Sequence, residues 1–162
     1  MPSSFHAGST GGYTVVKTLT LSLDTSAYAN GDLLADTQVI DNALRLTGGS
    51  GRIRSIAVLD EDDQTPYTFT VFVLDADVSL GTENSAISVT DANARNLIAA
   101  VDFATTDCRD MINSRFYYKS GLDIPITAIS ATDDIAIALA VITGTPTHTA
   151  SGIRVRIGIE QD

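Results

Sequence analysis

The chain has 162 residues and a mass of 17.1 kDa, a length that fits one domain rather than two. Ten basic and twenty acidic residues give a net charge of −10, which disfavours binding to nucleic acid or to an anionic membrane because such a surface repels phosphate. Hydrophobic residues make up 44% of the chain and charged residues 19%, so a disordered acidic polymer is excluded and a partner is expected to cover some weakly charged surface.

Residues 1–12 are rich in glycine, serine and threonine, with Phe5 as their apolar anchor. A segment of this composition does not fold by itself, so we predict an extended N-terminal arm followed by a single β-sandwich domain over residues 13–162. The sequence contains neither a secretory signal pattern nor an apolar run approaching the roughly 20 residues of a membrane span. We therefore expect a soluble protein made in the cytoplasm.

A period-two pattern begins at Tyr13, because leucines at 19, 21 and 23 alternate with threonine and serine, as in a half-buried strand. Further strands are predicted over residues 38–46 and 52–60. The mixed parity of the latter indicates a β-bulge or burial on both faces.

An acidic connection at residues 60–63 leads into a strand over 67–75, which is rich in β-branched and aromatic residues. We expect the strands before and after this connection to form a long hairpin. Thr90 can then cap a helix, and apolar residues occur after it at helical spacing. The pattern predicts one short helix over residues 91–99.

Four more strands are predicted, over residues 111–119, 123–129, 133–143 and 152–160. In the strand at 133–143, isoleucine, leucine and valine alternate with alanine, so we expect an inner strand or a subunit contact. Short strands separated by turn residues, with one helix, predict an all-β, mainly antiparallel fold: a β-sandwich or a jelly roll.

The residues that usually carry catalysis are scarce. His6 and His148 are the only histidines and Cys108 is the only cysteine, and no local signature of a nucleophile or of a zinc site accompanies them. We interpret His148 as a loop histidine and the acidic run at 60–63 as a solvated hairpin end rather than a calcium loop. We predict no enzymatic activity, no cofactor and no metal, and keep a hydrolase built on His148 as a remote alternative.

Four arginines alternate along two predicted strands of this acidic chain: Arg52, Arg54, Arg154 and Arg156. They fit a solvated strand face whose arginine stems cover apolar surface, or a basic stripe that meets an acidic patch on another protein. DNA binding is a poorer third interpretation at this net charge. The candidate partner-binding residues are these four arginines together with Phe5, His6 and Tyr13.

Three stretches are similar to segments of a known protein group: residues 57–63 (AVLDEDD), residues 79–96 (from SLGTEN to SVTDANARN) and residues 144–158 (GTPTHTASGIRVRIG). Through them the chain, from about residue 50 to its end, resembles the tailed-bacteriophage head decoration, or cement, proteins. No set of family site residues can be carried over.

The resemblance implies a β-rich homotrimer on the outside of a phage capsid, where it would brace junctions between major capsid subunits. The implied partners are the major capsid protein and further copies of the chain. The alternative from another class is a glycan- or receptor-binding β-sandwich of a virion tail or fibre, for which Tyr117 and Tyr118 are the candidate aromatic cluster.

Overall fold

The computed structural model describes residues 13–162, so the predicted arm, with its candidate residues Phe5 and His6, lies outside the described residues. The described part contains nine strands and two short helical segments. In chain order these are β1 (Tyr13–Thr20), β2 (Leu33–Ile40), β3 (Ser50–Asp60), β4 (Thr68–Leu74), α1 (Asp91–Ala94), β5 (Leu97–Phe103), η1 (Thr105–Asp107), β6 (Cys108–Asp110), β7 (Arg115–Thr127), β8 (Ile135–Thr143) and β9 (Ile153–Gln161). No described helix has the length and apolar character needed to span a membrane.

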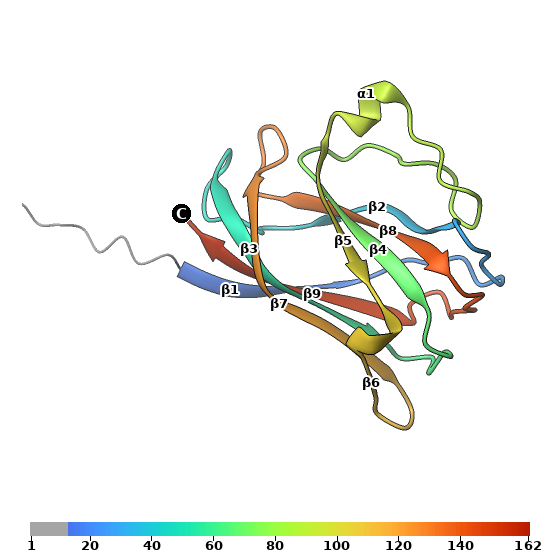
Figure 1. Cartoon of the computed structure of the whole chain (residues 1–162). Coiled ribbons are helices and arrows are strands. Elements are labelled where there is room, and N and C mark those ends of the chain that lie inside the picture. Colours follow the sequence, from blue (N-terminus) through green and yellow to red (C-terminus); the bar gives the residue numbers. More distant parts are fainter. Residues whose placement is uncertain (1–12) are drawn as a thin grey trace, which may run out of the picture.

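The strands form two antiparallel sheets that pack face to face, which confirms the predicted all-β sandwich (Figure 1). One sheet has the order β1-β9-β3-β7-β6 and the other has the order β2-β8-β4-β5. A single core lies between them, to which both sheets contribute fully buried side chains such as Ile56, Val155 and Leu139. The alternation of buried and exposed residues along β9 is the period-two pattern that the sequence carries.

Strand β8 is an inner strand, paired with β2 on one side and β4 on the other, as its sequence predicts. Its larger side chains, such as Ile137 and Leu139, belong to the core between the sheets, whereas Ala136, Ala138 and Ala140 belong to a second buried cluster on the outer face. This second cluster is completed by larger apolar residues: Leu33, Leu74 and Leu80.

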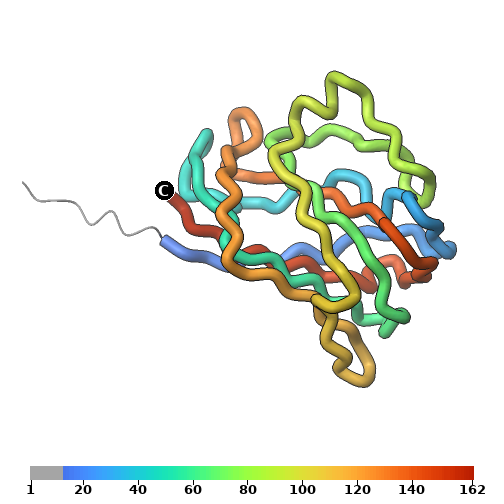
Figure 2. Tube along the Cα trace, viewed as in Figure 1, coloured from blue at the N-terminus to red at the C-terminus, as the bar shows by residue number. Residues whose placement is uncertain are grey.

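The cover over this alanine face is the long connection between β4 and β5, residues 75–96, which arches across the sheet (Figure 2). Backbone hydrogen bonds fix the connection to β2: the Leu33 amide donates to the Ser85 carbonyl at 2.9 Å, and the Asn84 amide donates to the Leu33 carbonyl at 2.9 Å. The Asp36 carboxylate also accepts a hydrogen bond from the Leu80 amide at 2.8 Å. The alanines are therefore covered by the same chain rather than by another subunit.

The helix predicted over residues 91–99 was too long. Thr90 does cap α1, its side chain accepting a hydrogen bond from the Asn93 amide at 3.2 Å, but the helix has only four residues. From Leu97 the chain is strand β5, paired with β4. Leu97 and Val101 have helical spacing but do not form a helix. The hydrogen bonds and packing that β5 gains by pairing with β4 outweigh the weak helix propensity of this short segment.

The predicted hairpin of residues 52–60 and 67–75 was also wrong. Strand β3 lies between β9 and β7 in one sheet and β4 lies in the other, so the connection between them crosses the sandwich. The second strand lies at Leu33–Ile40 rather than 38–46. The strands predicted at 111–119 and 123–129 are one long strand, β7, with a pairing irregularity opposite the predicted bulge of β3 between Ile53 and Ser55.

Truncation of Leu80 tests the cover over the alanine face. Leu80 is fully buried and its loss leaves a cavity, so Leu80→Ala is expected to lower the free energy of unfolding by about 2–5 kcal/mol. The matched control is Leu46→Ala, at a side chain that is 69% exposed, which is expected to change it by less than about 0.5 kcal/mol. Chemical denaturation measures both, and equal effects of the two substitutions would contradict the cover.

Candidate functional site

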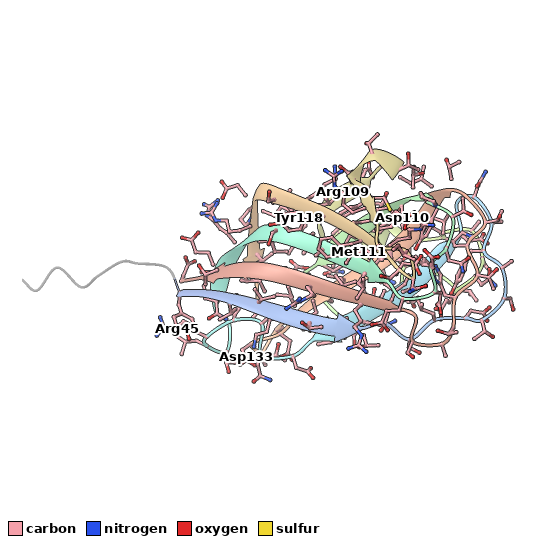
Figure 3. The ribbon with its side chains drawn as sticks, turned by 90° about the horizontal axis from the view of Figure 1, so that it is seen from below. Arg45, Arg109, Asp110, Met111, Tyr118 and Asp133 are labelled. Carbon is pink, nitrogen blue, oxygen red and sulfur yellow. The ribbon has the colours of Figure 1, made fainter. Side chains whose placement is uncertain are left out.

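The outer face of the sheet β1-β9-β3-β7-β6, hereafter the open face, has no such cover among residues 13–162 (Figure 3). The strand register places four side chains in one row across it. Thr18 of β1 is opposite Arg156 of β9, Arg156 is opposite Ala57 of β3, and Ala57 is opposite Tyr118 of β7. The open face is therefore built by segments far apart in the sequence.

A shallow groove of about 240 Å³ crosses the open face. Small residues form its floor, and a Cβ atom at position 158 would overlap the Ser55 hydroxyl unless that side chain rotated. Val16 and Tyr118 border the groove with side chains that are 59% and 48% exposed. Its lining consists of Val16, Ser55, Ala57, Phe116, Tyr118, Arg156 and Gly158. An apolar hollow on a solvent-facing sheet is the kind of surface that binding partners cover.

The structure brings all four candidate arginines to this sheet. Arg54 bonds Asp123 and, at 2.6 Å, Glu160, while Arg52 reaches Asp123 at 3.1 Å. Glu160 raises the pKa of the Arg54 guanidinium by accepting this hydrogen bond. These partners lie in the same chain, so Arg52 and Arg54 are largely neutralised.

The other two arginines differ from each other. Arg154 bonds Glu61 at 2.8 Å, whereas Arg156 makes no ion pair with the described residues and lines the groove. Tyr13, the remaining candidate within the described part, is exposed at the start of β1, opposite Gln161. Arg156 is thus the candidate arginine that no carboxylate of residues 13–162 pairs with, and it lies in an apolar setting.

A feature that the sequence did not reveal is the tip of the β6–β7 hairpin, residues 110–114, which projects from the sandwich (Figure 1). Met111 and Ile112 expose most of their side chains there, Ile112 to 82%. Ile112 has a φ of 75°, in the left-handed region that β-branched residues rarely adopt. The turn-forming pair Asn113-Ser114 was a signal for this hairpin, but residue 111 was predicted to begin a strand.

The acidic connection is not the solvated hairpin end that the sequence predicted. His148 does lie in a loop, as predicted, but it is buried. Asp60 and His148 are buried and Asp62 is half-buried, and the three side chains meet where the β3–β4 and β8–β9 connections come together. His148 Nδ1 lies 3.4 Å from an Asp62 oxygen and 3.7 Å from an Asp60 oxygen. Gly152 permits this approach, because a Cβ atom there would overlap the Asp62 carboxylate.

The surroundings of this cluster shift its pKa values. Burial raises the pKa of Asp60 to about 6 and lowers the pKa of His148, with Asp62 opposing the shift at His148. The Tyr67 hydroxyl lies 3.2 Å from His148 Nε2, and burial raises the Tyr67 pKa well above its ordinary value. At neutral pH the imidazole is therefore neutral and faces two carboxylates.

The hydrolase alternative needs a nucleophile beside His148. His148 does approach carboxylates, but its other ring nitrogen meets Tyr67, and no hydrogen bond joins it to a serine or to Cys108 within the described part. The half-buried Cys108 lies on β6, and burial raises the pKa of its thiol. The described residues therefore lack the nucleophile–base pair that such a mechanism uses.

Comparisons with known proteins do not identify a family. No family model and no curated protein matches the chain. Among solved structures, a chain of the structure of the Gx strain of infectious bursal disease virus matches with 12% sequence identity and a TM-score of 0.23, over 91% of this chain and 40% of that chain. This chain thus spans less than half the length of that viral chain, and a likeness at this TM-score carries no argument.

Replacement of Ile112 by glycine tests whether the hairpin tip stores strain. A left-handed backbone costs a non-glycine residue about 1–2 kcal/mol, which offsets the roughly 0.5–1 kcal/mol of extra unfolded-state entropy that glycine brings. Ile112→Gly is therefore expected to leave the thermal midpoint unchanged or to raise it. The control Ile142→Gly, at another exposed isoleucine but within β8, is expected to lower the midpoint. A similar loss for both variants would show that Ile112 is not strained.

Proposed function

We propose that the chain is a structural virion protein that binds the outer surface of a tailed-phage capsid through its open face and braces junctions between major capsid subunits. The observation that carries this proposal is the contrast between the two sheets. The outer face of one sheet is covered by residues 75–96, while the other presents an apolar groove with an arginine, Arg156, that has no ion-pair partner in the described part of the chain. The proposed function is binding rather than catalysis, with no cofactor, nucleic acid or membrane as a partner.

The chemistry of the groove supports a protein partner. The area to be covered is uncharged apart from Arg156, because its floor and walls are small or apolar residues. Arginine and tyrosine are the side chains that contribute most at the centre of protein interfaces. We therefore expect the partner to place a carboxylate against Arg156 and an apolar side chain beside Tyr118. Met111 and Ile112 add exposed apolar side chains at the tip of the β6–β7 hairpin, which belongs to the same sheet.

The arm and the trimer belong to the same proposal. Strand β1 is an edge strand of its sheet, so its outer edge can pair with a segment of another chain. We propose that residues 1–12, with Phe5 and His6, reach from the start of β1 across a neighbouring subunit and that three copies form the bracing unit. Each contact of such a unit can be weak, because several contacts made by one trimer together bind the capsid much more tightly than any one of them.

A charge reversal in the groove tests the proposed face. Arg156→Glu is expected to weaken binding to undecorated capsids by about tenfold or more, because it sets a like charge against the partner's carboxylate. The control is Arg45→Glu, which makes the same charge change on the exposed β2–β3 connection. Co-sedimentation with capsids gives both affinities, and equal weakening by the two substitutions would refute the groove as the contact.

The same assay tests the arm. Removal of residues 2–12 is expected to lower capsid occupancy while leaving the sandwich folded, as circular dichroism would show. Full occupancy after this deletion would remove the arm from the mechanism.

One observation favours the alternative of a glycan-binding protein. The rings of Phe116 and Tyr118 lie nearly parallel, 6.1 Å apart, and border a second hollow of about 410 Å³ that also contains Asp107 and Arg109. An exposed aromatic ring beside polar side chains can bind a sugar. Tyr117, the other aromatic candidate, is buried in the core and is not part of such a platform. Binding on a glycan array that Tyr118→Ala abolishes would favour this alternative over capsid binding.

A further inference from the structure

The cluster of Asp60, Asp62 and His148 has the spacing of ligands around one ion. One donor atom from each residue lies within 4.8 Å of the other two. His148 Nδ1 lies 3.4 Å from Asp62 Oδ2 and 3.7 Å from Asp60 Oδ1, close to the roughly 3.3–3.6 Å between two ligands of a tetrahedral ion with bonds of about 2.0–2.2 Å. The three side chains come from the end of β3, the β3–β4 connection and the β8–β9 connection.

Two buried side-chain atoms of this cluster that could bind a metal ion lack the hydrogen bonds that buried polar groups ordinarily have. His148 Nδ1 and Asp60 Oδ2 are both buried and make no hydrogen bond, although the side chains of both residues are fully enclosed. The other Asp60 oxygen accepts from the Asp62 amide at 2.9 Å. Such atoms are uncommon in folded proteins, and the fully buried His148 Nδ1, which lies 3.4 Å from Asp62 Oδ2 without a hydrogen bond, is an independent indication of a ligand site here.

The surroundings of the cluster are those of metal ligands. The Tyr67 hydroxyl lies 3.2 Å from His148 Nε2 and can accept a hydrogen bond from it, which would leave the Nδ1 lone pair directed at the carboxylates. Asp62 is oriented by the amide of Thr149 at 2.8 Å and by its hydroxyl at 3.0 Å. Side chains that orient the ligands in this way are typical of metal sites.

We propose that Asp60, Asp62 and His148 Nδ1 bind a divalent transition-metal ion, and that Zn²⁺ is the ion that this donor set fits best. One imidazole and two carboxylates give three nitrogen and oxygen ligands, and the partly exposed Asp62 provides the side from which the ion and a water ligand enter. Ca²⁺ takes six to eight oxygen ligands and Mg²⁺ takes an octahedron of oxygens, and neither prefers an imidazole.

The ion would have a structural role. Asp60 is the last residue of β3, in the sheet that carries the open face, and His148 lies in the connection that leads from β8 to β9. A bound ion would tie the β3–β4 and β8–β9 connections together. Because it binds the folded chain alone, its stabilising effect would grow with the logarithm of the free ion concentration once that concentration exceeds the dissociation constant. This proposal does not depend on capsid binding.

The test is the thermal unfolding of the full chain, stripped with a chelator and then titrated separately with Zn²⁺, Ca²⁺ and Mg²⁺. Zn²⁺ is expected to raise the midpoint at micromolar concentration and to bind in a ratio of one per chain. Asp62→Asn should raise the Zn²⁺ concentration needed for the same rise in midpoint by at least about tenfold, since it removes one charged ligand. The matched control Glu61→Gln makes the same charge change at a neighbouring exposed residue that pairs with Arg154, and should keep the full effect.

Further variants exclude binding elsewhere. His6→Asn and Cys108→Ser remove the other histidine and the thiol, and both should retain the zinc response. Co²⁺ binding, followed by visible absorption, gives a readout that is independent of stability and applies even if Asp62→Asn unfolds. The absence of a zinc response in the wild type, an equal response in Asp62→Asn, or a stronger response to Ca²⁺ would each overturn the proposal.

Discussion

The architecture depends on the two-sided burial of strand β8. Its isoleucines and leucine fill the core between the sheets, while its alanines lie flat beneath residues 75–96. The small side chains of the alanine row let the loop pack close to β8, and a larger residue in that row would push the loop outward. The alternation of large and small side chains in one strand thus decides which sheet of the sandwich is sealed by the chain itself.

Because the described part of the chain covers only one of the two outer faces, the opposite sheet is the one that is free to contact a partner. The groove of the open face lies over a floor of small residues between Val16 and Tyr118, and Arg156 lies within it without an intrachain partner among the described residues. Arg52, Arg54 and Arg154 form ion pairs with carboxylates of the same chain. The groove is therefore the part of this face where an arginine charge is not balanced by a described carboxylate. Apolar area with one unpaired charge suits recognition by a protein better than it suits catalysis.

The features that depend on period-two burial could be predicted from the sequence. The sandwich follows from the alternation of buried and exposed residues. The same pattern limited β8 to an inner strand or a subunit contact and β3 to a bulge or burial on both faces, and the structure shows the inner strand and the irregular pairing. The alternation of the arginines along two strands could be predicted, whereas the pairing of those two strands in one sheet could not. Which of the arginines form ion pairs could not be predicted. It depends on Asp123, Glu160 and Glu61, which lie near the arginines only because of the strand register.

The errors have a shared physical cause, which is contact between residues distant in the sequence. Leu97 and Val101 have helical spacing, but β4 offers them a strand partner. The connection at 60–63 resembles a hairpin end, yet it crosses between the sheets and carries Asp60 into the interior beside His148. A histidine between threonines gives no local sign of burial, so its environment could be known only from the fold.

The most direct test of the central claim, that the open face is the contact surface, is an electron cryomicroscopy reconstruction of capsids carrying this chain. The account predicts copies in groups of three, with the β1-β9-β3-β7 surface against a neighbouring protein and residues 75–96 directed to solvent. Capsid contacts made by residues 75–96, with the open face left bare, would contradict it.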